Sequence, residues 1–309
     1  MIDCFVVELL AITASTFSIQ TMEAFSGKYL ASGEYESAEW VILGAPFDGT
    51  SSFRPGSRFG PMALRQASIG LESYSPYQGK DLEKKQFADL GDLEFPLGNI
   101  EQTFEKISGA ISNIVNNGKK PLLLGGEHLI TFPSAKSVLQ KYSDIHLLAF
   151  DAHCDFRKEY LGQKFSHACT MHLCSEIMPV HLIGARSGIA EEFERAQEVC
   201  AMFSPFNFGR IEEALEAIGK NPLYLSIDLD VIDPAYMPGT GTPEPCGISA
   251  NEFFDTLLWI LGNANVVAAD ITELSPMLDP SGASSALAAK IAREIILSGT
   301  SLHIASKAK

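Results

Sequence analysis

Short apolar runs recur along the chain, and turn residues follow each of them. Because the runs are apolar along their whole length, they predict strands that are buried on both faces, as in a parallel sheet. The expected strands are Trp40–Ala45 (WVILGA), Pro121–Leu124 (PLLL), Ile145–Phe150 (IHLLAF), Val180–Gly184 (VHLIG), Leu223–Ile227 (LYLSI) and Val266–Ile271 (VVAADI).

Amphipathic stretches with helical spacing separate these runs. In residues 100–116, the side chains of Phe104, Ile107, Ile111 and Ile114 fall on one stripe. The alternation of strand and helix predicts an α/β fold with an open, mainly parallel sheet, helices on both sides, and a ligand site at the carboxyl ends of the strands. The other expected helices are Phe132–Tyr142, Ile189–Val199, Ile211–Ile218, Ala250–Leu261 and Ser284–Leu297.

Side chains of the kinds that bind metal ions follow three of the expected strands. In an extended chain, side chains two residues apart point to the same side, so Asp151, His153 and Asp155 are expected to project together. Asp228 and Asp230 are expected to do the same on another strand. The candidate metal ligands are His128, Asp151, His153, Asp155, Asp228 and Asp230.

Four carboxylates placed together repel one another unless cations neutralise them. Oxygen ligands with two imidazoles favour a hard divalent ion such as Mn²⁺. Six ligands suit two ions about 3.5–4 Å apart that share carboxylates. Each short motif by itself is typical of a turn or a cap, so this prediction depends on their combination. Glu127, which precedes His128, is expected to have a structural role behind the ligands.

Composition and charge narrow the choice of partner and compartment. The chain of 309 residues has 38 acidic and 23 basic residues and a net charge of −15. This acidity argues against nucleic acid or an anionic membrane as a partner and is compatible with a cationic small molecule. Six scattered cysteines without a CxxC pair indicate a reducing, cytoplasmic location. The apolar stretch 4–19 is too short to span a bilayer, so residues 1–21 are expected to be peripheral to one domain of residues 22–309.

The segments GGEH, FDAHCD, SIDLDVIDPAYMPGTGTPEP and TELSP stand in this order along the chain. In order and spacing they resemble the signature segments of the ureohydrolases, the arginase and agmatinase family. The resemblance runs from about Phe25 to the carboxyl terminus. With RPGSRFGP and IGLESYSP, the chain looks closest to bacterial agmatinases.

The resemblance implies a pair of Mn²⁺ ions with Asp151 and Asp228 as bridging ligands. It also implies that His167 transfers a proton, that Glu273 grips a guanidinium, and that the Thr240–Thr242 loop lines the site. The implied fold is a three-layer α/β/α domain, which in this family assembles as trimers or hexamers. One ion would be held by His128, Asp151, Asp155 and Asp228, and the other by Asp151, His153, Asp228 and Asp230.

The expected reaction is hydrolysis of agmatine to urea and putrescine, a step of polyamine synthesis, by a hydroxide that bridges the two metals and is oriented by Asp155. Glu159 is a candidate for binding the ammonium end of agmatine. Arg157 would favour an acid such as 4-guanidinobutyrate if it pointed inward, and is otherwise a salt-bridged loop residue. The alternatives are therefore a guanidinobutyrase, another guanidino-compound ureohydrolase, or a non-catalytic binding protein of the same fold.

Overall fold

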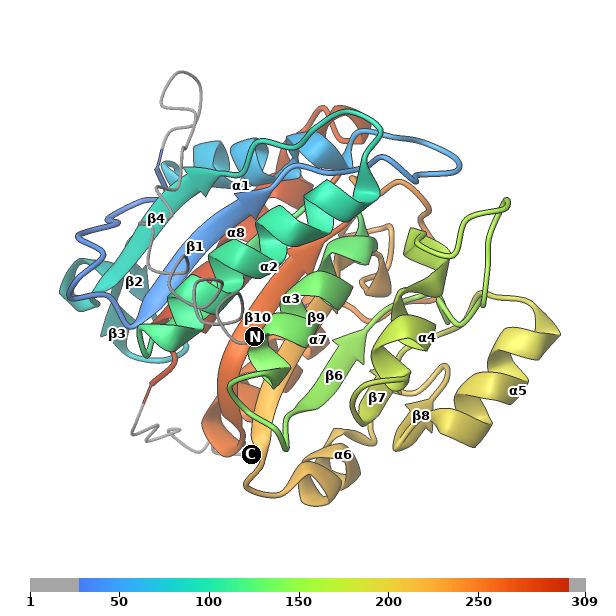
Figure 1. Ribbon diagram of the computed structural model, residues 1–309. Coiled ribbons are helices and arrows are strands. Elements are labelled where there is room, and N and C mark those ends of the chain that lie inside the picture. The colour runs from blue at the N-terminus through green and yellow to red at the C-terminus, as the bar shows by residue number, and fades with distance from the viewer. Residues whose placement is uncertain (1–27, 300–309) are drawn as a thin grey trace, which may run out of the picture.

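The computed structural model describes residues 28–299 (Figure 1). The peripheral segment expected at residues 1–21 lies outside this range, and the domain boundary at Met22 stays a prediction. No helix within residues 28–299 is both long and apolar enough to cross a membrane.

A sheet of eight strands crosses the molecule in the order β4-β1-β5-β10-β9-β6-β7-β8, and every neighbouring pair is parallel. The six expected apolar runs form β1, β5, β6, β7, β9 and β10, the strands with the longest buried stretches. Helices cover both faces of the sheet, so side chains on both sides of these strands are apolar. A separate antiparallel pair joins β2 (Tyr74–Ser75) to β3 (Lys80–Asp81). The sheet strands are β1 (Trp40–Ala45), β4 (Phe87–Asp92), β5 (Lys120–Gly125), β6 (His146–Phe150), β7 (Val180–Ile183), β8 (Met202–Ser204), β9 (Pro222–Asp228) and β10 (Asn265–Thr272).

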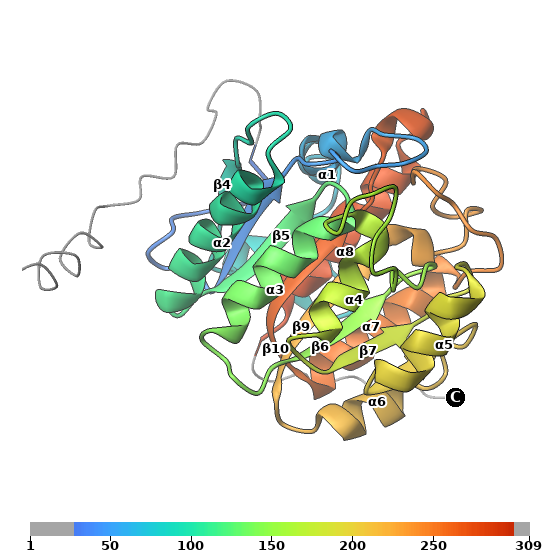
Figure 2. The same cartoon turned by 45° about the vertical axis from the view of Figure 1, so that its right-hand side comes forward.

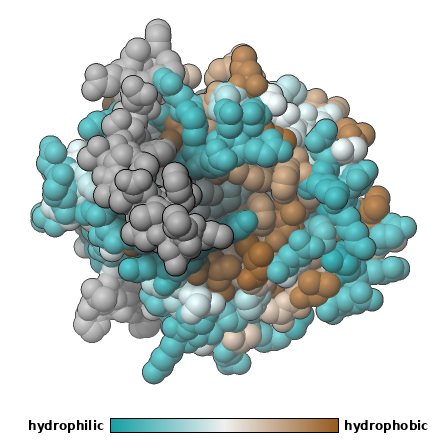
Figure 3. All heavy atoms as spheres, in the orientation of Figure 1, coloured by the Kyte–Doolittle hydropathy of each residue, from teal (hydrophilic) through white to brown (hydrophobic). Residues whose placement is uncertain are grey.

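Two hydrophobic clusters, one on each face of the sheet, complete the expected three layers (Figures 1 and 2). Helices α2 (Ile100–Asn116), α3 (Thr131–Leu139), α4 (Thr170–Ser175) and α5 (Ala190–Val199) pack on one face. On the other face lie α1 (Gly60–Ser68), α6 (Ile211–Ile218), α7 (Ala250–Asn263) and α8 (Ala283–Leu297). In the space-filling view of the face with α2 and α3, hydrophilic side chains surround a more apolar centre (Figure 3). The predicted α/β/α architecture is confirmed.

The pattern of apolar residues did not predict β4, β8, α1 or α4, nor the β2–β3 pair. Strand β4 contains two acids, Asp89 and Asp92, which form ion pairs with the buried Arg65 of α1. These ion pairs neutralise the acids and so allow them in a buried strand. The partners are 24 and 27 positions apart, so a local sequence pattern cannot reveal them. Strand β8 is three residues long, which is too short for periodicity to reveal.

Candidate active site and metal centre

The first ligand-type side chain, His128, begins a short 3-10 helix after β5. A close backbone approach fixes this turn, because a Cβ atom on Gly126 would lie 1.9 Å from the carbonyl oxygen of Phe47. Only glycine allows the end of β5 to pass the chain at Phe47. The His128 side chain is 1% exposed and points between the ends of the central strands.

His128 is held by different partners at its two ring nitrogens. Nε2 lies 2.9 Å from the hydroxyl of Ser226, which donates to Asp270 at 2.7 Å. Because Nε2 is occupied by Ser226, Nδ1 is the ring nitrogen that faces the carboxylates. Nδ1 lies 2.9 Å from Asp151, 3.3 Å from Asp228 and 3.6 Å from Asp155. This is the orientation of an imidazole that ligates a metal ion.

The second imidazole, His153, lies on the other side of Asp151. Its Nδ1 is 3.0 Å from Asp230 and 3.6 Å from Asp151. The described residues contain two groups that could hold a metal ion, His128 with Asp151 and Asp228, and His153 with Asp151 and Asp230. The structure therefore brings together all six side chains that the strand-end motifs predicted, with Asp151 shared.

The reason for their convergence differs from the one expected. Strand β6 ends at Phe150, and Asp155 has φ 49, so residues 151–155 are not an extended strand. The segment is instead fixed by hydrogen bonds, from the Ala152 N–H to Asp230 at 3.1 Å and from the His153 N–H to Asp151 at 2.7 Å. Side-chain alternation at strand spacing was therefore the wrong explanation for a correct grouping.

Burial and mutual repulsion make two of the carboxylates, Asp155 and Asp228, hard to ionise without cations, whereas bonds to His128 and His153 lower the pKa of Asp151. Burial and the charge of Asp151 raise the pKa of Asp155 to about 7, and burial with Asp230 and Asp151 raises the pKa of Asp228 well above its usual value. Burial would lower the pKa of His128, but its bonds to Asp151 and Asp155 outweigh this and raise it. An anionic, oxygen-rich group of donors of this kind fits hard divalent cations.

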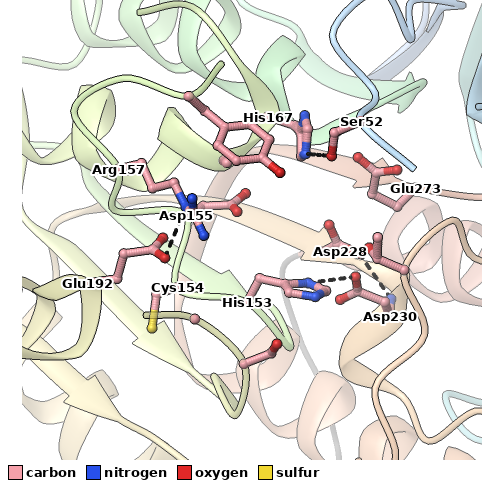
Figure 4. Close-up of a pocket in the computed structure, with 15 residues that line it drawn as sticks. Ser52, His153, Cys154, Asp155, Arg157, His167, Glu192, Asp228, Asp230 and Glu273 are labelled. Atoms are coloured by element: carbon pink, nitrogen blue, oxygen red, sulfur yellow. Dashed lines mark hydrogen bonds and ion pairs between the residues drawn. The ribbon is translucent and has the colours of Figure 1, made fainter. Parts of the chain in front are cut away.

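Three other predicted residues, His167, Glu273 and Thr242, line the same cavity of about 160 Å³ as His153 and Asp230 (Figure 4). Glu273 follows β10, and its Oε1 accepts the backbone N–H of His128 at 2.8 Å. Its carboxylate therefore belongs to the same buried assembly as the candidate ligands. Burial, followed by the charge of Glu127, raises the pKa of Glu273 well above its usual value.

Comparison with known proteins agrees with this geometry. The sequence model of the arginase family matches residues 38–298. The chain belongs to the arginase family. It is 42% identical to the agmatinase of Bacillus anthracis, over 89% of this chain and 97% of that protein. A crystal structure of a putative agmatinase from Clostridium difficile matches with a TM-score of 0.82 and 41% identity, over 86% of this chain and 99% of that one. The predicted resemblance to ureohydrolases, and among them to bacterial agmatinases, is confirmed.

More distant members of the arginase family also match this chain. The mitochondrial guanidino acid hydrolase of Homo sapiens is 32% identical, over 84% of this chain and 78% of that protein.

Two loop residues weighed for substrate recognition lie in different surroundings. Glu159 is exposed and lines a neighbouring cavity of about 550 Å³ beside α5, not the cavity that contains His153. Arg157 lines both cavities and pairs with Glu192 at 3.2 Å. It therefore points inward and is salt-bridged at the same time, whereas the sequence presented these as alternatives.

The motifs of this arginase-family chain did not reveal several residues that hold the site. The carboxylate of Glu127 accepts the N–H and hydroxyl of Thr50 and so holds the loop after β1, which agrees with the structural role expected for Glu127. Thr50 in turn accepts the His167 N–H at 3.1 Å. The sequence does contain a signal for Asp270, because an acid inside the apolar run VVAADI indicates a buried polar partner. Ser226 gave no such signal.

Proposed function

We propose that this chain is an agmatinase that hydrolyses agmatine to urea and putrescine with two Mn²⁺ ions per subunit. The observation that carries the proposal is that four candidate ligands, His153, Asp155, Asp228 and Asp230, line one cavity with Glu273. The other two, His128 and Asp151, lie against these ligands. The agmatinase relatives, which the chain matches along almost their whole length, support the choice of substrate. We further propose a cytoplasmic trimer or hexamer that acts in polyamine synthesis, with no nucleic acid or membrane partner.

The metal ions would be held by the ligand sets expected from the sequence. His128, Asp151, Asp155 and Asp228 would hold one ion. His153 and Asp230 would complete the second set, together with the shared Asp151 and Asp228 carboxylates. Two such ions would supply activation of water as a nucleophile.

The protein's own residues bind and orient the substrate. A guanidinium is planar and cationic, so a carboxylate such as Glu273 can hold it through paired, charge-assisted hydrogen bonds. The His128 N–H fixes one oxygen of that carboxylate, which limits the orientations it can adopt. The surrounding acids make the cavity attractive to a cation.

His167 is placed to move a proton to the leaving amine. Its Nε2 lies 3.4 Å from the hydroxyl of Ser52 at the cavity wall, and Nδ1 lies 3.4 Å from Thr50 (Figure 4). Burial lowers the pKa of His167 below its usual value, so the ring is neutral at pH 7. Nε2 can then accept a proton from the attacking water and pass it to the leaving amine.

A urea-release assay with Mn²⁺ tests the proposed function. We expect agmatine to be hydrolysed faster than 4-guanidinobutyrate or arginine, and chelation of the metal to abolish activity until Mn²⁺ is restored. Asp230→Asn should reduce both bound metal and activity at least about 100-fold, because it removes a ligand. Asp144→Asn, an exposed acid remote from the site, is the matched control. Absence of urea release from every guanidino substrate would contradict the proposal.

A second candidate substrate class, the guanidino acids, is favoured by one observation. Arg157 lines the cavity and could pair with the carboxylate of 4-guanidinobutyrate. Its ion pair with Glu192 neutralises the cation, which is why agmatine ranks first. Substrate ranking in the same assay decides between the two, and a higher kcat/KM for 4-guanidinobutyrate would reverse our choice.

A further inference from the structure

Residues 157–168 form a loop that closes on itself above the cavity. At its base, the Arg157 N–H donates to the carbonyl of Ala168 at 3.0 Å. At its tip, Tyr160 and Gln163 exchange two backbone hydrogen bonds of 2.8 and 2.9 Å. The two residues between them have positive φ, 48 for Leu161 and 78 for Gly162, as in a tight two-residue hairpin turn. The backbone therefore fixes the position of Tyr160.

The returning leg of this loop is anchored by an aromatic contact. The ring of Phe165 lies 5.1 Å from that of Phe104 on α2 and 6.4 Å from that of Phe132 on α3. His167 follows two residues later and begins a short 3-10 helix. Both legs of the loop are thus attached to the rigid part of the fold, with Tyr160 on one and His167 on the other.

The aromatic ring of Tyr160 contacts the imidazole of His167 across the loop. The ring centroids are 5.8 Å apart and the planes are at 88°, an edge-to-face arrangement. The other contacts of the imidazole are hydrogen bonds of 3.4 Å to Thr50, Ser52 and Ser166, which are long for this type of bond. Such bonds restrain the ring weakly, so an aromatic neighbour has a large effect on its orientation.

The buried acid Glu192 holds Arg157, whose guanidinium packs on the ring of Tyr160. The guanidinium carbon of Arg157 lies 4.6 Å from the centroid of the Tyr160 ring, within the range of a cation–π contact. Arg157 donates from Nε to Glu192, whose side chain is 5% exposed. Glu192 also accepts the backbone N–H groups of Phe156 and Ile189 at 3.2 and 3.0 Å. Figure 4 shows Glu192 and Arg157 at the left of the cavity and His167 at its top.

We propose that Arg157 and Tyr160 form a stacked support that holds the imidazole of His167 in the orientation needed for proton transfer. This role rests on the proposed function, since it assumes that His167 serves a guanidino hydrolase. Arg157 and Tyr160 are positioning residues, and Glu192 keeps Arg157 in place.

A double-mutant cycle tests whether Tyr160 acts through His167. Loss of a general acid–base group costs about 10²- to 10⁴-fold in rate, so His167→Ala should lower kcat by that range. Tyr160→Leu should lower kcat about 10- to 100-fold with less than about 3-fold change in KM. In the His167→Ala background, the same Tyr160→Leu change should alter kcat less than about 2-fold. Tyr160→Phe keeps the ring and should stay within about 3-fold of the parent enzyme.

Tyr77→Leu is the matched control, because Tyr77 also lies under a cation, Lys290 at 5.1 Å, but outside the site. Equal losses from Tyr160→Leu with and without His167 would overturn the proposal, as would an unchanged kcat in the single variant. If Tyr160→Leu does not fold, Arg157→Gln replaces it, with an expected 3- to 10-fold loss of kcat that disappears in the His167→Ala background. A parent enzyme that releases no urea would instead count against the proposed function.

Discussion

Among individual residues, His128 connects the buried core to the cavity. One of its ring nitrogens faces three carboxylates, and the other is bonded to Ser226 and through it to Asp270. Asp270 is itself fully buried and also accepts the hydroxyls of Thr131 and Tyr224 at 2.8 Å. The imidazole is therefore oriented before any ligand arrives, which reduces the entropy lost on binding.

Removal of the Ser226 hydroxyl tests this orientation. Ser226→Ala leaves the Nε2 proton of His128 without its acceptor, so the affinity for Mn²⁺ should fall about 10- to 100-fold. Titration of the metal-free protein by calorimetry measures the change. Ser137→Ala is the control, because Ser137 is a buried serine that bonds only to the backbone of its own helix. Equal Mn²⁺ affinity in Ser226→Ala and the parent protein would contradict the role given to Ser226.

At the scale of elements, the site depends on how the strands end. The ends of β5, β6 and β9 could be predicted, since each apolar run stops where ligand-type residues begin. The ring contact between Tyr160 and His167 could not, because it requires the hairpin turn that folds the loop back. The path of this loop also explains why Glu159, a candidate for binding the ammonium end of agmatine, does not line the cavity of His153. Glu159 is close to Asp155 in sequence but lines the neighbouring cavity. Sequence order predicts the strand ends well, and it predicts loop side chains poorly.

The turn after β5 offers a test at this scale. Gly126→Ala would force the chain away from Phe47, because a Cβ atom would lie 1.9 Å from its carbonyl oxygen. Displacing the turn moves His128, so we expect a loss of bound Mn²⁺ together with a destabilisation of about 1–3 kcal/mol. Metal analysis and urea unfolding measure the two effects. Gly33→Ala, whose new Cβ would meet only an ordinary 3.7 Å contact, should change neither.

In the molecule as a whole, the carboxyl and amino ends of the sheet strands carry different polar side chains. Candidate ligands gather at the carboxyl ends, whereas a pair of stacked histidines, His146 and His181, lies where β6 and β7 begin. Nδ1 of His146 is 3.0 Å from Nε2 of His181, and the Nδ1 of His181 is buried with no hydrogen-bond partner within residues 28–299. Burial, followed by the charge of His146, lowers the pKa of His181 from 6.5 to about 4.

This histidine makes the stability of the molecule depend on pH. Between pH 6.5 and 4 the unfolded chain binds a proton at His181 and the folded chain does not, so stability falls as the pH falls. The difference between 6.5 and about 4 corresponds to at most about 3 kcal/mol. His181→Phe should lose less unfolding free energy than the parent between pH 7 and 4, as measured by urea denaturation at each pH. Parallel pH profiles for the two proteins would contradict this assignment.

Strand β10 is the last strand along the chain, yet it lies between β5 and β9, two of the strands that deliver candidate ligands. During synthesis, residues 128 and 228 are made before residues 265–272. Until that final strand inserts, β5 and β9 have no partner between them and their ends are not held at the distance seen in the finished sheet. The candidate ligands on β5 and β9 are therefore brought together only once β10 has been added, and a metal site built from them would form late in biogenesis.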